Sequence, residues 1–370
     1  MSKGTLHSSE VRSFSDEATG VQVRQLTNHP SIHHHPFYYL PAWDDAMQRM
    51  TLVSHRTGKP QLYSMPYSSG ELVQLTDRND LNEWSIHPSH DGRFVYFTAG
   101  SGGWRVDTDS LKEEQLVAFD NDVVGGNEGL VGAAMGTTTV SRDDRWWAVP
   151  VTLGDVARLF VIDTASGKSS VIHEGDTIGH PQFHPDDSNR LRYAGPHHAR
   201  IWTIRRDGSE NRLVYERNVE KKEWIVHETW CPGTMEILTA NWPQGVIGID
   251  VLSGSIRQVA RFNAWHPMIN RKGNLMVTDT RDPDIGLQLF KVDDGNNPPQ
   301  SLCTTSSSNA GDHWSIDHCP YDDGPVKVYA PQHTHPHPTF SPDGRRVAFT
   351  SDRSGHSQIY EVEIPEEFNS

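Results

Sequence analysis

The chain has 370 residues, of which 35% are hydrophobic, and its 30 glycines and 23 prolines indicate a soluble globular protein with many turns. The 33 basic and 48 acidic residues give a formal net charge of −15, so most of the surface repels nucleic acid and anionic membranes. The net charge therefore excludes nucleic acid and membranes from the expected partners. An anionic ligand would need positively charged residues at its binding site.

The sequence also predicts the cellular compartment. The first residues contain no apolar run typical of a signal sequence, and no stretch of eighteen apolar residues occurs anywhere. The three cysteines, Cys231, Cys303 and Cys319, have spacings that match neither a disulfide framework nor a CxxC zinc site. We therefore expect a cytoplasmic protein, and the sequence makes no prediction about its oligomeric state.

A recurrent unit runs along the chain. It consists of an apolar or aromatic residue, one or two spacers, an Asp or Gly turn, a strand, a Gly-containing turn and a second strand. The seven copies begin at Trp43, His87, Val140, Phe183, Trp230, Ile269 and Phe340. Most intervals are about 40 to 50 residues, the length of a four-stranded propeller blade, and helical periodicity is nearly absent. The sequence therefore predicts an all-β, seven-bladed β-propeller.

The two ends of the chain predict how the ring closes. Residues 21–27 resemble the outer strand expected at 71–76, but no blade precedes them. The last unit stops after a strand at 359–364 without an outer strand. We expect the N-terminal strand to complete the last blade, because this pairing would hide a sheet edge. The chain is then a single domain over 1–370, with an insertion at about 296–330 where the last interval is longer.

Four blades carry histidine at one equivalent position, six residues before the turn. These histidines are His180, His227, His266 and His337, and all except His227 are followed by proline. Because the first strand of each propeller blade lines the central channel, equivalent positions converge at one mouth of that channel. We expect these imidazoles to meet there.

The stretch from Gln332 to His337 adds further candidate ligands. Side chains alternate in an extended segment, so His335 and His337 point the same way. Imidazoles bind Mn, Fe, Ni or Zn, and the amide oxygen of Gln332 favours a harder ion with more ligands than structural zinc takes. The residues predict a divalent metal site, with Mn²⁺ preferred and other divalent ions as alternatives. The competing interpretation is a set of solvated histidines at strand ends.

The other histidines each have more than one interpretation. His180 is either a ligand or a wall of the pocket, and His266 is either a ligand or only the start of a His-Pro strand. The run His33–His35 is expected to form a loop over a mouth, with His33 as a candidate substrate contact.

Several of these motifs occur together in a known family. The segment Gln332-x-x-His335-x-His337, followed by Pro338-Thr339-Phe340-Ser341-Pro342-Asp343, resembles the metal motif of oligogalacturonate lyases, polysaccharide lyase family 22. Four further segments follow the order of that family: 180–187, 200–202, 227–230 and 266–268. The resemblance covers roughly residues 179–370.

The resemblance implies a seven-bladed propeller that holds Mn²⁺ with three histidines and one glutamine and cleaves short galacturonides by β-elimination. In this chain the implied metal ligands are His266, Gln332, His335 and His337. The resemblance also implies a Brønsted base at His227 and a substrate-binding or catalytic arginine at Arg200.

The chemistry of this reaction agrees with these residue types. β-Elimination removes the C5 proton next to the carboxylate of a uronide, and a metal and Arg200 can stabilise the charge that develops. His227 suits proton removal near neutral pH, and its alternative role is a fourth ligand. We therefore expect a lyase of pectin degradation that gives an unsaturated or keto-deoxy uronate. The alternative is a non-catalytic TolB-like binding module, because 340–352 also resembles the blades of such propellers.

Overall fold

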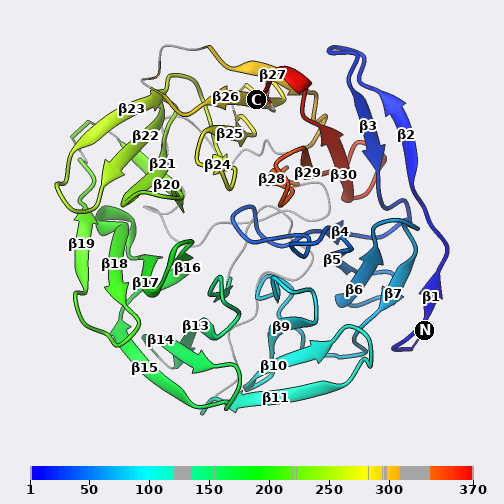
Figure 1. Cartoon of the computed structure of the whole chain (residues 1–370), viewed down its shortest axis with the longest axis horizontal. Helices are drawn as coiled ribbons and strands as arrows, with labels where there is room; N and C mark the ends of the chain where they lie inside the picture. The colour runs from blue at the N-terminus through cyan, green and yellow to red at the C-terminus, as the bar shows by residue number, and fades with distance from the viewer. Residues whose placement is uncertain are drawn as a thin grey trace.

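Seven antiparallel sheets surround one axis, and the first strand of each blade lies nearest to that axis (Figure 1). The computed structural model describes residues 2–120, 136–153, 155–218, 220–221, 223–281, 283–293, 295, 298–308 and 334–368. The predicted all-β, seven-bladed propeller is confirmed. Among the described residues, the short helical turns are η1 (His197–Ala199) and η2 (Glu366–Phe368), and no helix is long and apolar enough to cross a membrane.

The first four blades follow one another in chain order. Blade 1 contains β4 (His33–His34), β5 (Arg49–Ser54), β6 (Gln61–Pro66) and β7 (Leu72–Gln74). Blade 2 contains β8 (His87–Pro88), β9 (Phe94–Ala99), β10 (Gly102–Asp107) and β11 (Glu113–Ala118). Blade 3 contains β12 (Thr139–Val140), β13 (Trp146–Leu153), β14 (Val156–Asp163) and β15 (Ser169–Gly175). Blade 4 contains β16 (Gly179–His184), β17 (Asp187–Ala194), β18 (Ile201–Arg205) and β19 (Arg212–Tyr215).

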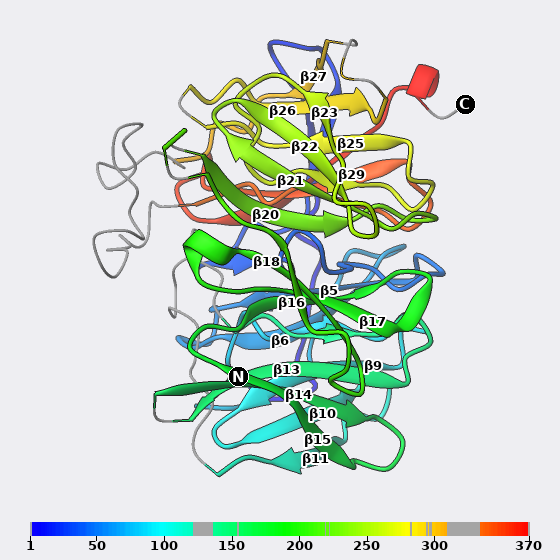
Figure 2. The same ribbon diagram turned by 90° about the vertical axis from the view of Figure 1, so that its left-hand side faces the viewer.

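The remaining blades complete the ring, and their strands run across its thickness (Figure 2). Blade 5 contains β20 (Trp224–Trp230), β21 (Glu236–Trp242), β22 (Gly245–Asp250) and β23 (Ile256–Ala260). Blade 6 contains β24 (Met268–Ile269), β25 (Leu275–Thr278), β26 (Leu287–Lys291) and β27 (Gln300–Cys303). Blade 7 begins with β28 (Thr339–Phe340), β29 (Arg346–Ser351) and β30 (Gln358–Glu363).

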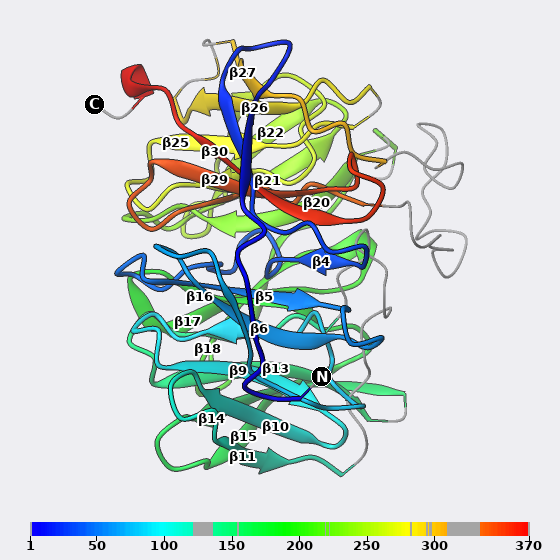
Figure 3. The same cartoon turned by 90° about the vertical axis from the view of Figure 1, so that its right-hand side faces the viewer.

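The N-terminal segment runs along the rim from blade 1 to blade 7 (Figure 3). β3 (Gln22–Gln25) pairs with β30, with Val23 opposite Val362, and β2 (Arg12–Ser15) lies outside β3. β1 (Leu6–His7) pairs with β7 of blade 1. The N-terminus therefore adds strands to both blades, whereas the sequence predicted only the strand beside the last blade.

An insertion was predicted at about 296–330, and the predicted position of its start is wrong. Residues 300–303 form β27, the outer strand of blade 6, because Leu302 and Cys303 are buried in the core between blades 6 and 7. Residues 309–333 lie outside the described part of the chain.

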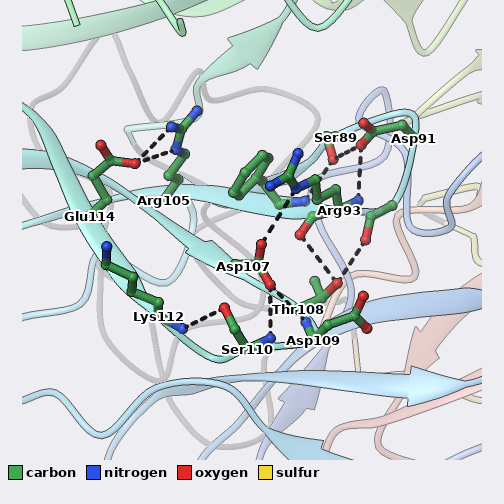
Figure 4. A network of polar contacts seen from close by, with 12 residues as sticks. Ser89, Asp91, Arg93, Arg105, Asp107, Thr108, Asp109, Ser110, Lys112 and Glu114 are labelled. Carbon is green, nitrogen blue, oxygen red and sulfur yellow. Dashed lines mark hydrogen bonds and ion pairs between the residues drawn. The ribbon is translucent and has the colours of Figure 1, made fainter.

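The repeated sequence unit corresponds to a repeated hydrogen-bonded turn. Ser89, Ser141 and Ser341 each donate their hydroxyl to the aspartate two residues later, at 2.6, 2.5 and 2.5 Å. In blade 2 the Ser89 hydroxyl also accepts a bond from the backbone N–H of Phe94 at 2.9 Å (Figure 4). Since the same serine holds both sides of the turn, it fixes the step from the first strand of the blade to the second.

The outer hairpins use aspartate in a similar way. Asp107 Oδ1 accepts bonds from the backbone N–H groups two and three residues later, at 3.1 and 2.8 Å (Figure 4). Asp163 and Asp250 make the same pair of bonds in blades 3 and 5. These local turns explain why a propeller can be predicted from a single sequence.

The hydrophobic core lies between neighbouring blades. Val53 and Leu62 of blade 1 belong to one buried cluster with Val95 and Phe97 of blade 2. Both faces of a blade are covered by its neighbours, so central strands such as β13 are apolar on both faces and buried over 147–151.

We expect Val23→Ala to lower the free energy of unfolding by about 2 kcal/mol. Val23 on β3 is fully buried and belongs to the cluster that joins blades 6 and 7. The matched control is Val171→Ala on β15, where the side chain is 41% exposed and the expected change is below about 0.5 kcal/mol. Chemical denaturation measures both, and equal shifts would contradict a packed N-terminal strand.

Candidate metal centre at one mouth of the channel

Three of the predicted histidines meet at one end of the inner strands. His266 precedes β24 of blade 6, and His335 and His337 precede β28 of blade 7. The His337 ring centroid lies 4.2 Å from that of His266 and 5.5 Å from that of His335. One ring nitrogen of each residue lies within 4.8 Å of the others, and all three side chains are buried. The structure therefore brings His266 to a pair of histidines about 70 residues later in the sequence.

Neighbouring groups orient these rings. Asp279, directly after β25, has its Oδ2 2.7 Å from His266 Nδ1 and accepts a bond from the backbone N–H of His266, which leaves Nε2 of that ring for a ligand. Arg281 Nη1 donates to His335 Nε2 at 3.1 Å, so Nδ1 is the nitrogen that His335 can offer. His337 Nε2 is buried and has no hydrogen-bond partner among the described residues.

The donor set fits a divalent transition metal. Burial lowers the pKa of His266 and of His337 well below the usual value, so both rings are neutral and carry a lone pair. A carboxylate on the far nitrogen of a histidine, as Asp279 provides, is the usual partner of a metal-binding imidazole. The fourth predicted ligand, Gln332, lies outside the described residues.

Three of the four histidines of the predicted register share an unusual backbone conformation. His180, His227 and His337 have φ values of 46°, 60° and 48°. This left-handed region is uncommon for residues other than glycine and persists where surrounding structure enforces it, often at functional sites. Equal spacing in the sequence therefore corresponds to equal conformation in three different blades.

His227 lies beside the three-histidine group without belonging to it. Its ring centroid is 4.1 Å from that of His266, and its Nδ1 faces the carbonyl oxygen of Trp265 at 2.6 Å. Because a carbonyl oxygen only accepts, Nδ1 carries the proton and Nε2 carries the lone pair. Burial lowers the pKa of His227 to about 3, so the ring is neutral at neutral pH.

Arg200 reaches the same region from the end of η1. Its Nε donates to Glu228 Oε1 at 2.8 Å, and Arg192 Nη1 lies 3.3 Å from Glu228 Oε2. Burial alone would raise the pKa of Glu228, but the two guanidinium groups hold it at about 2. Glu228 directly follows His227, so one short segment of β20 carries the candidate base and the anchor of the arginine.

The structure places His180 at the wall of the site. Its ring stacks on Phe37 with centroids 5.2 Å apart, and its Nδ1 lies 3.1 Å from the Thr137 hydroxyl. His180 is not among the three residues whose nitrogens converge. The geometry favours the pocket-wall alternative over the ligand alternative.

The expectation for His33–His35 needs correction. The first two of these residues form β4, the buried inner strand of blade 1, because they pair in register with β5. The His33 ring lies inside this blade, with Nδ1 3.0 Å from the carbonyl of Ser31 and Nε2 2.9 Å from the hydroxyl of Ser54. The structure therefore does not bring His33 to the three histidines.

Sequence analysis missed an aromatic segment that crosses the axis at residues 37–40, which we call the axial plug (Figure 1). Phe37 contacts the ring of His337 at a centroid distance of 4.9 Å. The Tyr38 hydroxyl donates to the carbonyl of Glu228 in blade 5 at 2.9 Å. The run Phe37-Tyr38-Tyr39-Leu40 between a strand and a turn was the available signal, because such a run is rarely left in solvent.

The axial plug divides the channel. On its far side lies a cavity of about 360 Å³, lined by Tyr39 and Leu40 and by turn residues such as Asp186 and Pro342. The candidate metal centre lies at the opposite ends of the same inner strands. The two mouths of the propeller are therefore separate spaces.

Fold and site together define a seven-bladed propeller with a buried group of three histidines at one mouth, and His227 and Arg200 lie beside this group. A family model described as oligogalacturonate lyase matches residues 1–368, and the chain belongs to this family. The protein is therefore a lyase that acts on oligogalacturonides. This membership decides against the non-catalytic binding module.

The comparisons with individual proteins agree over the full length. The chain is 26% identical to the oligogalacturonate lyase of Dickeya dadantii (strain 3937) and 25% identical to the oligogalacturonide lyase of Pectobacterium atrosepticum, over 99% of each chain. The structure of an oligogalacturonate lyase in complex with manganese superimposes with a TM-score of 0.81 at 24% identity, covering 99% of both chains. That of an oligogalacturonate lyase from Vibrio parahaemolyticus gives 0.80 at 24% identity, covering 99% of this chain and 100% of that chain. These structural matches establish the fold.

Proposed function

We propose that the protein cleaves short oligogalacturonides by β-elimination and that it depends on a divalent metal, with Mn²⁺ preferred. The ligands are His266, His335 and His337, with Gln332 as the fourth. The observation that carries this proposal is the convergence of three buried imidazoles from two blades within 4.8 Å. A relative of the same fold was solved in complex with manganese, which supports the choice of ion.

The residues of this chain have distinct roles in the proposed reaction. His227 Nε2 takes the C5 proton of a galacturonide, the C5–H electrons form the C4=C5 double bond, and the C4–O bond breaks with protonation of the leaving oxygen. When bound, the divalent ion supplies positive charge that stabilises the anion developing on the substrate carboxylate. The unsaturated uronate then opens to a keto-deoxy uronate.

Arg200 supplies further positive charge at the mouth. A chain with a net charge of −15 repels an anionic substrate at long range, so the site needs a local counter-charge. The side chain of Arg200 is 16% exposed and is held by Glu228. A guanidinium group at this position offers the planar set of donors that suits a carboxylate. We propose that Arg200 binds the carboxylate at the reacting ring and that His180 lines the substrate pocket.

We expect Glu228→Gln to lower kcat on digalacturonate about 10- to 100-fold, since the ion pair that holds Arg200 becomes a hydrogen bond to an uncharged amide oxygen. The metal content should stay unchanged because Glu228 is not in the three-histidine group. The control is Glu236→Gln on the same blade. The Glu236 carboxylate lies away from the mouth and pairs with Arg257 at 2.6 Å. Steady-state kinetics compare the two, and an unchanged kcat in the first variant would contradict the anchoring role.

The experiment that tests the proposed function is absorbance of the conjugated C4=C5 bond during incubation with digalacturonate. We expect a rise that a chelator abolishes and that added Mn²⁺ restores. A rise that is insensitive to the chelator would refute metal dependence, and no rise on any galacturonide would refute the elimination reaction. Cys231 and Cys303 are free and buried, which supports our proposal that the protein acts in the reducing cytoplasm.

A further inference from the structure

A second group of metal-binding side chains lies at the junction of blades 1 and 2. Glu83 precedes β8, and its Oε2 lies 3.1 Å from His34 Nε2 on β4 and 2.6 Å from Nε2 of His55, which follows β5. The three ligand atoms lie within 4.8 Å of one another. His34 and Glu83 are buried, and the side chain of His55 is 13% exposed, which gives the group one edge on solvent.

The two polar contacts of His34 are not both satisfied by a neutral imidazole. Its Nδ1 faces the carbonyl oxygen of His35 at 3.1 Å, and a carbonyl only accepts, so Nδ1 carries a proton. Its Nε2 faces Glu83, whose carboxylate also only accepts when ionised. A neutral His34 would direct a lone pair at a carboxylate oxygen. Either an added proton on Nε2 or a metal ion between the two groups removes this conflict.

The surrounding structure holds the three groups as a metal site requires. The ring of His34 stacks on Trp84 with centroids 4.2 Å apart and planes 21° apart. The backbone N–H of His55 donates to the carbonyl of Ile32 at 2.9 Å, which fixes the chain after β5. An Nδ1–H bonded to a backbone carbonyl, as in His34, is a common arrangement of histidines that bind metal through Nε2.

The group is separate from the candidate metal centre. The ring of Trp84 lies between them, with its centroid 4.2 Å from that of His34 and 5.9 Å from that of His337. The ligands come from blades 1 and 2, whereas the other centre uses blades 6 and 7. An ion in one place would therefore not share ligands with an ion in the other.

We propose that His34, His55 and Glu83 bind a second divalent transition metal of the zinc class that ties blade 1 to blade 2. Two imidazoles and one carboxylate form a known ligand set of Zn²⁺ and of non-haem Fe²⁺. With metal–ligand bonds of about 2.0 Å, tetrahedral geometry separates ligand atoms by about 3.3 Å. The 2.6 Å contact between His55 and Glu83 therefore lengthens by less than about 1 Å, which side-chain rotation provides. Solvent at the exposed edge of His55 fills the remaining position.

Zinc stoichiometry of the full chain tests this proposal without depending on turnover. After removal of metal by a chelator, the protein is equilibrated with Zn²⁺ and its metal content is measured by mass spectrometry. We expect two equivalents per chain for the wild type, one for His55→Gln and one for His335→Ala. Glu83→Gln removes another ligand of the same proposed site and should also bind one equivalent. Circular dichroism establishes that each variant is folded.

The control is His90→Gln, because His90 also pairs with a carboxylate, Asp144, at 2.7 Å but belongs to neither metal group. This variant should keep both equivalents. Equal metal content in the wild type and in folded His55→Gln would overturn the second site. Equal zinc content in the wild type and in folded His335→Ala would instead contradict the candidate metal centre of His266, His335 and His337.

Discussion

Replacing His335 with alanine is expected to remove the catalytic ion and to lower turnover of digalacturonate by roughly 1000-fold. The physical reason is that the variant keeps only two of the three buried imidazoles that converge at the mouth. A bound metal stabilises the charged transition state by several kcal/mol, and about 4 kcal/mol corresponds to a factor of 1000 in rate. Manganese content and kcat, measured on the same preparation, check the prediction.

The control for this experiment is His173→Ala. His173 lies on β15 at the outside of blade 3, where its Nδ1 lies 3.3 Å from the side-chain amide of Asn211 in an exposed setting. This variant should keep both manganese and turnover. Full activity of metal-free His335→Ala would contradict a metal-dependent reaction.

Replacing His227 with alanine is expected to lower kcat by about 10²- to 10⁴-fold while manganese stays bound. His227 carries its proton on Nδ1, held by the carbonyl of Trp265, so its Nε2 is ready to accept another. The variant loses the base and leaves the three-histidine group intact. Metal content and kcat together distinguish this outcome from that of His335→Ala.

An isotope experiment makes the role of His227 more specific. Digalacturonate deuterated at C5 should react more slowly than the protonated substrate with the wild-type enzyme, because the C5–H bond breaks in the step that His227 assists. Loss of manganese from His227→Ala would support the alternative in which His227 is a fourth ligand.

The propeller and the convergence of three histidines could be predicted from the sequence for a physical reason. Each blade is built from local turns, such as the Ser89 turn, that recur at a regular spacing. Residues at one offset from these turns occupy one level of the channel, which relates His266 to His337, and the alternation of side chains in an extended segment places His335 beside His337. Local repetition here encodes a long-range arrangement.

Other residues of the site could not be predicted from the repeated sequence unit. Asp279, which orients His266, and Glu228, which holds Arg200, are single acidic residues among 48 in the chain. Their roles depend on contacts between side chains that no periodic pattern specifies. His33 was misplaced because polar residues with a following proline suggest a loop, whereas pairing with β5 buries them in a strand.

The axial plug blocks the central channel of the propeller between its two mouths. Phe37 to Leu40 are almost completely buried and bridge blade 1 to blade 5 through the Tyr38 hydroxyl. A sugar chain therefore cannot thread through the ring, and a product must leave by the opening through which its substrate came. Movement of a sugar chain along the axis beyond the three histidines is therefore blocked by Phe37 and the residues that follow it.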